Sequence, residues 1–340
     1  MAFAADTHPT LKDVLASQDS AGNIMSVAEL LMQENEILHD MIFMPSNEVQ
    51  SHRHTIRTGL PEGVWRGYNI GVPSSKSTSE TVVDTIGNYE LYATVDKDLV
   101  ELNGNSAAWR MMEEKPFREK MMQAVAQQLI YGNEADEPEG FTGIMPRYNT
   151  VSTGVSESAD NVIDAGGTGT DNASILLVSW DPNAAFGIYP RGKMASGGMM
   201  VEDLGEQVLQ NLPTAAGGTN GTMRALQTHY KWELGFALRD WRYCGRIANI
   251  DKSALKADAA SGAVLADHMF ELMELIPSDM GRMAFYMSRN VRTKLYQQNS
   301  ALVKNSTLMV ENVGGQRTMM FQGIPIRRVD VMAADEARVV

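Results

Sequence analysis

The clearest helical pattern in the sequence covers residues 105–132. Apolar residues recur there at every fourth position, as expected for one stripe of a helix: Phe117, Met121, Val125 and Leu129. Asn105 or Ser106 can cap the start, and Gly132 predicts the end, because glycine adopts the left-handed conformation that often closes a helix. Pro116 lies inside the span and lacks an amide hydrogen, so we expect either a kink or a second helix that starts at this residue.

Alternation of apolar and polar positions predicts a long β-hairpin over residues 63–102, immediately before this helix. One strand is expected at residues 64–70, a polar tip at residues 71–79, and a return strand at residues 81–95. Two arms of ~10 residues at ~3.3 Å per residue would reach about 30 Å. Because an isolated two-stranded hairpin is only marginally stable in water, we expect these arms to lie on a partner. The alternative for the polar tip is an ordinary surface loop.

A capping box predicts an amphipathic helix at residues 26–41, with Ser26 at the N-cap and Glu29 three residues later. Its apolar stripe must be buried against other groups. Packing on its own domain and clasping of a neighbouring subunit fit this pattern equally well.

The rest of the chain mixes strands and helices without a βαβ repeat, which predicts the α+β fold class. The apolar phase reverses near Asp240, so we expect a bulge or a strand break there. Ser288 is expected to cap a helix, and Gly314-Gly315 to form a two-residue hairpin turn. We expect strands at residues 174–180, 185–189, 222–250 and 283–287 and helices at 264–276 and 288–298. A hairpin is expected to close the chain at residues 307–330. Surface loops are expected at residues 133–146, which include a solvated acidic turn, and at residues 147–173.

Composition and charge narrow the function. The chain of 340 residues is 44% hydrophobic and 21% charged, which is typical of a globular protein. Its formal net charge of -13 makes tight nucleic-acid binding unfavourable, because phosphate contacts need a basic surface. The N-terminus lacks the pattern of a signal peptide, and no apolar run approaches the roughly 18 residues of a membrane span. The 23 methionines suit adaptable core packing or a sliding subunit interface.

The sequence contains no catalytic pattern that we would assign. It lacks a Gly-x-Ser-x-Gly elbow, a His-Glu-x-x-His motif, and a Walker or Rossmann fingerprint. The single cysteine, Cys244, lies in a β region and is expected to be a buried small hydrophobe. His52 and His54 share one face of a strand but have no third ligand nearby, so we expect surface histidines rather than a metal site. We therefore expect no catalytic, cofactor-binding or metal-binding residue.

Several blocks of the sequence, in order, resemble the major capsid proteins of tailed bacteriophages, which have the Hong Kong 97 fold. Among these proteins, the sequence most resembles those of short-tailed phages. The blocks are residues 26–41, similar to the N-terminal arm; 63–86, similar to the E-loop; 105–131, similar to the spine helix of the peripheral (P) domain; 140–144, similar to the turn after the spine; 180–192 and 229–242, similar to strands of the axial (A) domain; and 321–326, similar to the return of the P-domain hairpin.

The resemblance implies a domain organisation. The expected parts are an N-terminal arm at residues 1–56, an E-loop at 57–96, a P domain with the spine helix at 97–146, an A domain at 147–304, a P-domain hairpin at 305–332 and a C-terminal strand at 333–340.

The resemblance also implies a function and partners. A structural, non-enzymatic protein is expected, which self-assembles as pentamers and hexamers into an icosahedral shell around double-stranded DNA. Its partners would be itself, a portal, a separate scaffolding protein and a cement or decoration protein, with no sequence-specific DNA binding, no cofactor and no membrane. It would belong to the virion and assemble in the host bacterial cytoplasm. The alternatives are an encapsulin-like nanocompartment shell, a soluble enzyme with an unrecognised site, and a tail or decoration protein.

The subunit interface is expected to involve the N-terminal arm, the long hairpin, the long helix and the closing hairpin. The residues expected there are Leu30, Leu31, Leu38, Tyr68, Ile70, Val72, Lys76, Val82, Phe117, Arg317 and Arg327. Some members of the resembled family join an E-loop lysine to an asparagine of a neighbour by an isopeptide bond. Lys76 lies in the corresponding place, but we can nominate neither an acidic catalyst nor a partner asparagine, and we expect no crosslink.

Overall fold

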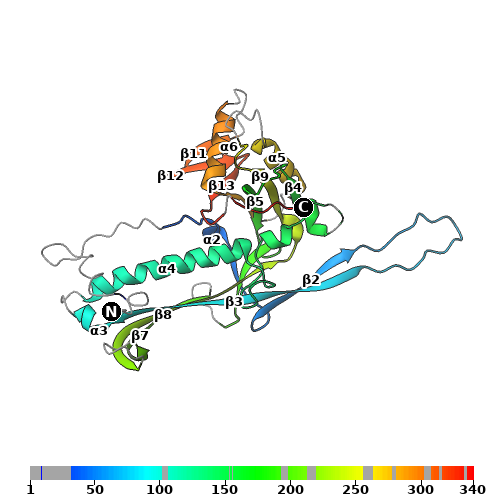
Figure 1. Ribbon diagram of the computed structural model, residues 1–340. Helices are drawn as coiled ribbons and strands as arrows, with labels where there is room; N and C mark the ends of the chain where they lie inside the picture. The colour runs from blue at the N-terminus through cyan, green and yellow to red at the C-terminus, as the bar shows by residue number, and fades with distance from the viewer. Residues whose placement is uncertain are drawn as a thin grey trace. The chain divides into compact units, whose positions relative to one another are not determined.

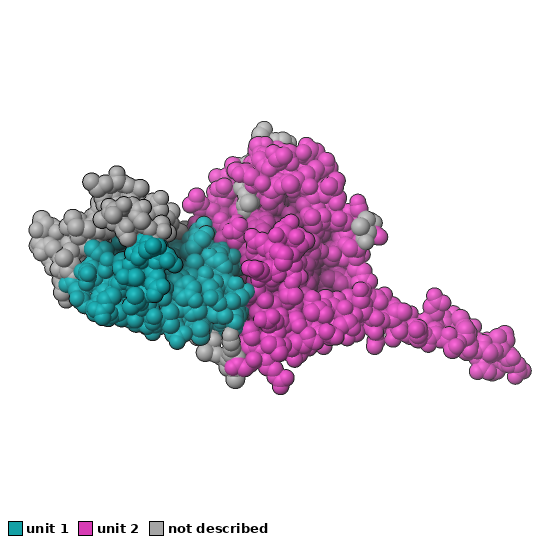
Figure 2. All heavy atoms as spheres, turned by 60° about the horizontal axis from the view of Figure 1, so that its bottom comes forward, with its two compact units in different colours: residues 1–33, 88–125, 198–233 teal, residues 34–87, 126–197, 234–340 magenta. Residues whose placement is uncertain are grey.

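The computed structural model describes residues 9, 32–101, 106–152, 154, 156–192, 198–212, 220–255, 263–277, 281–301, 308–313, 316–332 and 335–340 (Figure 1). The chain divides into two compact units (Figure 2). Unit 1 comprises residues 1–33, 88–125 and 198–233, and unit 2 comprises residues 34–87, 126–197 and 234–340.

Unit 1 contains a strand pair against which a long helix packs. β7 (Met199–Leu212) runs antiparallel to β8 (Gly221–Leu238), which neighbours β3 (Thr78–Asp96) in the sheet. The short α3 (Lys97–Glu101) follows β3, and α4 spans Ser106–Tyr131. The Glu114 carboxylate of α4 accepts hydrogen bonds from the hydroxyls of Thr228 and Tyr230 on β8 (2.6 and 3.1 Å). These bonds tie the helix to the sheet, beside a small core of Val95, Val100 and Trp109.

Unit 2 holds most of the strands. Its sheet runs in the order β11-β12-β13-β10-β5-β6; β9 also pairs with β5, β4 with β9, and β1 with β6. The strands are β1 (Phe43–Pro45), β2 (Ser51–Gly59), β4 (Val162–Asp164), β5 (Asn172–Trp180), β6 (Ala185–Tyr189), β9 (Cys244–Asp251), β10 (Arg282–Met287), β11 (Leu308–Val313), β12 (Gln316–Phe321) and β13 (Ile324–Arg328). The helices are α2 (Ile37–Asp40), α5 (Leu265–Leu275) and α6 (Arg289–Ala301), with 3-10 turns η1 (Met145–Tyr148), η2 (Glu157–Asn161) and η4 (Trp241–Tyr243).

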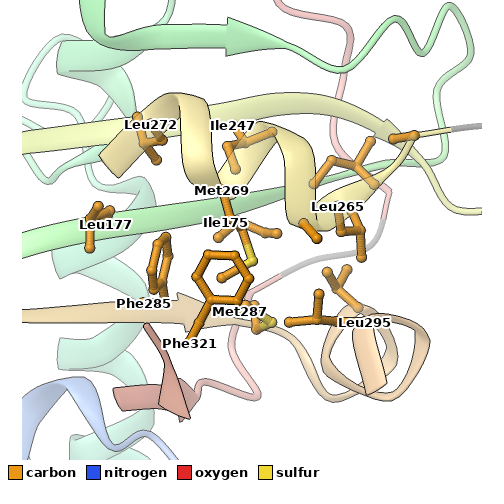
Figure 3. Close-up of a cluster of buried hydrophobic side chains, with 14 of the residues drawn as sticks. Ile175, Leu177, Ile247, Leu265, Met269, Leu272, Phe285, Met287, Leu295 and Phe321 are labelled. Atoms are coloured by element: carbon orange, nitrogen blue, oxygen red, sulfur yellow. The ribbon is translucent and has the colours of Figure 1, made fainter. Parts of the chain in front are cut away.

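The main core of unit 2 lies where α5 and α6 pack against the sheet. Side chains from α5, α6, β5, β9 and β10 converge there (Figure 3). Every residue of β5 is buried, in keeping with its nearly continuous apolar run. The buried residues include Ile175, Leu177, Ile247, Leu265, Met269, Leu272, Phe285, Met287, Leu295 and Phe321.

Most of the strands and helices predicted for unit 2 are confirmed. The structure has β5, β6, β10, α5 and α6 where the pattern predicted them. The strand break near Asp240 is also confirmed, because the Asp240 carboxylate accepts a hydrogen bond from the Arg242 amide (3.1 Å) and caps η4. In the closing hairpin, Val313 pairs with Gln316, so the connection has the predicted length; its two glycines lie outside the described residues.

The helix predicted at residues 26–41 is wrong in its described part. Only Ile37–Asp40 is helical, and residues 26–31 lie outside the described residues. Asn35 instead forms a β-bridge with Val329, and the Glu36 amide donates to the Arg328 carbonyl (3.2 Å). Pairing with a distant strand therefore outweighs the local helical pattern.

The hairpin is present, but its strands are shifted from the prediction. Its paired strands are β2 and the first half of β3, while residues 64–70 form no strand. The ladder extends from the pair Ser51↔Thr85 to the pair Gly59↔Thr78. The apolar residues at 64–70 thus belong to the connection between the strands, where no cross-strand partner is available to order them.

The long helix forms as predicted, but two details differ. α4 continues through Pro116, so the alternative of a second helix start is wrong. Contacts on both sides favour continuation: Glu114 binds β8, and the Arg118 guanidinium lies over the Tyr230 ring (5.9 Å to its centroid). Gly132 is not left-handed; it is needed because a Cβ there would clash with Gln128.

A glycine-containing turn closes the C-terminus of α4. The Ile144 amide donates to the Leu129 carbonyl (2.9 Å), and the Gly143 amide donates to the Gly132 carbonyl (2.8 Å). The Gln128 side chain donates to the Phe141 carbonyl (3.0 Å). The last carbonyls of a helix have no partner within it, so this turn supplies the missing donors.

Other parts differ from the expectation. Residues 147–173 are not simply a surface loop, because Tyr148 and Asn161 are buried and donate to backbone carbonyls beside the strand break. β7 mixes apolar and polar residues without regular alternation, so the sequence pattern did not predict it. The Ser288 hydroxyl makes no hydrogen bond to the described residues, so α6 begins without its predicted side-chain cap.

A buried ion pair holds the C-terminal segment. Among residues 335–340 the structure has one β-bridge, between Asn172 and Glu336. The Glu336 carboxylate pairs with Arg246 (2.8 Å), with side chains 7% and 5% exposed. Tyr131 and Ser174 also donate to Glu336. Because one cation and two hydroxyl donors of unit 2 meet at this carboxylate, its charge is fully compensated.

We expect Gly143→Ala to lower the free energy of unfolding by about 1–3 kcal/mol. A Cβ at this position would lie 2.5 Å from the Leu129 carbonyl oxygen, and this backbone atom cannot turn away as a side chain can. The measurement is chemical denaturation of the full chain. Gly63→Ala is the matched control, since a Cβ there meets nothing within 4 Å. Equal stability of the two variants would contradict the prediction.

Glu336→Gln is expected to destabilise the chain by about 3 kcal/mol, because it leaves the buried Arg246 without its counter-ion. Thermal and urea unfolding would measure the loss. Glu274→Gln, at an exposed position on α5, should change stability by less than about 0.5 kcal/mol. A loss for Glu336→Gln as small as that of the control would show that the ion pair is not needed.

Candidate assembly surfaces

The most exposed apolar surface of the described chain lies on the hairpin of unit 2. We call residues 51–85 the arm: β2, the connection at residues 60–77, and the first part of β3. Figure 2 shows it as a narrow extension of unit 2. All residues of the connection are exposed, including six large apolar ones: Leu60, Val64, Trp65, Tyr68, Ile70 and Val72.

The aromatic residues of the arm have no contacts that bury them. Trp65 and Tyr68 are 105% and 100% exposed relative to a reference residue, so they gain nothing from the fold of their own subunit. A soluble monomer seldom exposes a contiguous apolar patch of this kind, and such patches mark interaction sites. The exposure of these residues therefore makes the arm the candidate interaction surface of unit 2.

The arm also differs from the rest of the chain in charge. The arm contains four basic residues, Arg53, Arg57, Arg66 and Lys76, and three acidic residues, Glu62, Glu80 and Asp84. The arm is therefore positive within a chain of net charge -13. Arg53 pairs with Glu48 (3.0 Å), whereas the other three cations make no ion pair within the described residues. An acidic partner would complement them.

A buried charge pair fixes the base of the arm. Asp84 of β3 accepts from Arg147 of η1 (2.7 Å), and both belong to unit 2. Arg147 also donates to the carbonyls of Thr142 and Gly143 (3.2 Å each), and its guanidinium lies over the Phe236 ring (5.5 Å). The same arginine thus holds the arm, β8 and the turn after α4 together.

A second set of contacts holds the next residue of the arm. Thr85 donates to Glu134, which also accepts from Thr142 (3.4 Å). Part of the predicted acidic turn is therefore structural, while Asp136, Glu137 and Glu139 are exposed as predicted. Gly235 is required beside Thr85, because a Cβ there would meet the Thr85 carbonyl.

The sequence did not predict the roles of Arg147 and Asp84, because a single charged residue gives no periodic signal.

The residues predicted for the interface fall into three groups. Tyr68, Ile70, Val72 and Lys76 are exposed on the arm, and Val82 and Phe117 are half-buried. Leu38 is buried within its own subunit, and Arg327 forms ion pairs with Glu36 and Asp40 of the same chain (3.1 Å each). Leu30, Leu31 and the side chain of Arg317 lie outside the described residues; the Arg317 backbone is on β12, opposite Asn312.

The two histidines of β2 differ from the surface histidines that we expected. His54 is only 7% exposed, and His52 is half-buried with its ring edge-on to Phe186 (5.4 Å between centroids). Burial lowers the pKa of both imidazoles. In the part of the chain that the structure describes, no three His, Cys, Asp or Glu residues are grouped as metal ligands.

Cys244 lies in the core of unit 2, as predicted. Its side chain is fully buried, and burial raises the pKa of the thiol to about 12. A thiol in this state has almost no thiolate at neutral pH and is a poor nucleophile. None of the helices described is long and apolar enough to cross a membrane.

Comparison with known proteins gives one family and a full-length structural relative. The family model of the major capsid protein GP7 matches residues 19–340. A chain in the near-atomic structure of bacteriophage Epsilon15 is 33% identical, with a TM-score of 0.78, and the match covers 100% of this chain and 99% of that one. No curated protein sequence matches the chain significantly.

Two further solved structures are more distant. A chain in the capsid of a native GTA particle is 8% identical, with a TM-score of 0.45, over 66% of this chain and 93% of that one. A chain of the holo-SrpI encapsulin complex from Synechococcus elongatus PCC 7942 is 9% identical, with a TM-score of 0.42, over 72% of this chain and 97% of that one. These similarities are too low to favour one kind of shell over another.

We expect Cys244 to resist a water-soluble thiol reagent in the native protein and to react fully after denaturation. Its burial excludes the reagent, and its raised pKa suppresses the reactive thiolate. Reaction would be followed by absorbance at mildly alkaline pH, with free cysteine as the control. Rapid stoichiometric labelling of the native chain would contradict the structural role of this thiol.

Proposed function

The chain belongs to the family of the major capsid protein GP7, and from this membership we propose that it assembles as pentamers and hexamers into a closed icosahedral shell around double-stranded DNA. It is a structural major capsid protein of a phage and a part of the virion. Its α+β fold is Hong Kong 97-like, matched over its full length by the Epsilon15 chain. The observation that carries the assembly proposal is the arm, whose apolar residues have no partner in their own subunit.

The proposed domain organisation follows the resemblance. Residues 1–56 are the N-terminal arm, 57–96 the E-loop, 97–146 the P domain with α4 as the spine, 147–304 the A domain, 305–332 the P-domain hairpin and 333–340 the C-terminal strand. The position of α4 directly after the hairpin supports this order. The single bridge at Glu336 gives the last segment a clamping role.

We propose that the arm docks on a second copy of this chain. Burying Trp65 and Tyr68 on a neighbour would remove the largest exposed aromatic surfaces of the subunit from water. The unpaired cations of the arm suit an acidic neighbour, and a second copy carries the required negative charge. Shells assembled from many such contacts reach high stability although each contact is modest.

Partners beyond the chain itself follow from the family. We propose a portal, a separate scaffolding protein and a cement or decoration protein, with assembly in the host bacterial cytoplasm. DNA would be enclosed without sequence-specific contacts, because tight binding of its phosphates needs a basic surface and this chain is acidic. Nothing in the buried thiol or the histidine pair supports catalysis, and the proposed role is non-enzymatic.

Electron microscopy of the purified chain, expressed alone and with its genomic neighbours, tests assembly directly. Closed shells, or rings of five and six subunits, are expected. Packaged DNA identifies a phage capsid, whereas a packaged enzyme would favour the encapsulin-like alternative. Small, uniform oligomers under every condition would contradict the proposed function.

We expect Trp65→Ser combined with Tyr68→Ser to raise the subunit concentration required for assembly at least about tenfold, since buried aromatic anchors dominate interface energies. Subunit stability should change by less than about 0.5 kcal/mol, because both residues are exposed. Deletion of residues 72–79 should likewise block or alter assembly of a folded subunit. Tyr296→Ser, at an exposed tyrosine on α6, is the matched control. If both arm variants form normal shells, the arm is an ordinary surface loop with no role in assembly.

A further inference from the structure

The base of the arm concentrates buried polar atoms that have no hydrogen bond. Among the described residues, eight buried side-chain nitrogen and oxygen atoms lack a hydrogen-bond partner, and four of them lie on His52, His54 and Asp84. Buried polar groups are nearly always satisfied, so a cluster of exceptions at one place calls for an explanation. All three residues belong to unit 2.

The geometry brings the three groups into one buried layer of the β2–β3 ladder. His52 lies directly opposite Asp84 in the strand register, and the His52 and His54 rings are 6.1 Å apart. The His54 Nδ1 atom is 3.6 Å from the Asp84 Oδ2 atom, which is too long for a hydrogen bond. The side chains of His54 and Asp84 are 5% and 2% exposed.

The negative charge of Asp84 is already matched. Arg147 of η1 binds its other carboxylate oxygen at 2.7 Å. Asp84 still favours a proton on His54 and Arg147 opposes it, while burial is the largest effect and disfavours the proton. In a site removed from water such a charge is costly, because burial disfavours the charged form of an imidazole.

The other charged groups around the histidines act in both directions. Arg239, after β8, opposes protonation of both rings, and Glu48, before β2, favours it for His52. The Leu238 backbone has the smallest effect and favours protonated His54 as a weak acceptor, although the contact does not meet the geometry of a hydrogen bond. Burial is the largest effect on each ring and lowers both pKa values, and His54 also opposes protonation of His52.

We propose that His52 and His54 form a proton-sensitive hinge, at which mild acidification loosens the base of the arm. A solvated histidine has a pKa near 6.5, whereas the closed base holds the pKa of each ring below that value. The opened base therefore binds more protons, and stability that is complete above about pH 6.5 is lost as the pH falls below it. Acidification would therefore make the base of the arm more mobile and leave the residues at its tip chemically unchanged.

This hinge goes beyond the docking role proposed for the arm, and only its consequence for assembly rests on that role. A subunit with a loosened base presents its arm in more orientations, which weakens docking that needs one orientation. The hinge itself is a property of unit 2 and is measurable in subunits that have not assembled.

Hydrogen exchange of the full chain, as dissociated subunits, tests the hinge at about pH 7.5 and about pH 5.5, on either side of the histidine range. After correction for intrinsic exchange, protection of β2 should fall on acidification by up to about tenfold per histidine. Peptides from β10 serve as the internal reference, because this strand lies in the core of unit 2.

Variants assign the effect to the two rings. His52→Gln with His54→Gln should abolish the pH-dependent loss in β2, and His52→Gln alone should reduce it. His39→Gln, at an exposed histidine of α2, should leave it unchanged. The hinge is overturned if β2 protection in the wild-type chain is unchanged or rises relative to β10 on acidification, a result that does not depend on the folding of any variant. It is also overturned if the double variant keeps the full effect. Shell formation is scored separately, so failure of the hinge and failure of assembly remain distinguishable.

Discussion

A two-stranded ribbon cannot bury its own apolar side chains, because it has two faces and no second layer to cover them. The arm meets this constraint with six large apolar residues exposed along its connection. Within its own subunit these residues gain nothing from folding, so their stabilisation must come from another molecule. The subunit is therefore folded but leaves these residues uncovered, and the assembly proposed above would supply the missing burial. This single constraint explains why a structural role fits the chain better than a catalytic one.

An arm that serves a neighbour must be held firmly at its root. Arg147 links Asp84 of β3 to Phe236 of β8 and to the carbonyls after α4. The glycines of that turn allow close approach, which closes the helix end and positions Arg147 at the same time. A few polar contacts thus fix the position of the arm, while the proposed docking would draw its strength from the exposed apolar residues. The residues that orient the arm are therefore different from those that would determine its affinity for a neighbour.

The histidine pair adds a condition to this arrangement. One buried and one half-buried imidazole beside a carboxylate that Arg147 already binds favour the uncharged state, because burial disfavours the charged form. The hinge proposed here would make the firmness of the root depend on pH, without any change to the docking surface. A residue pair that resembled a weak metal motif in the sequence is better understood through its burial.

The sequence by itself determined the fold class, the order of hairpin, long helix and turn, and membership of a capsid family, because these follow from local periodicity and from motifs in a fixed order. Local patterns also located β5, β6, β10, α5 and the break at Asp240. Only the tertiary structure decided the rest. Bridging to Val329 replaced the predicted helix around Asn35, and the clash with Gln128 gave Gly132 a different purpose. The meetings of Asp84 with Arg147 and of Glu336 with Arg246 join residues 63 and 90 positions apart, and no local pattern encodes them.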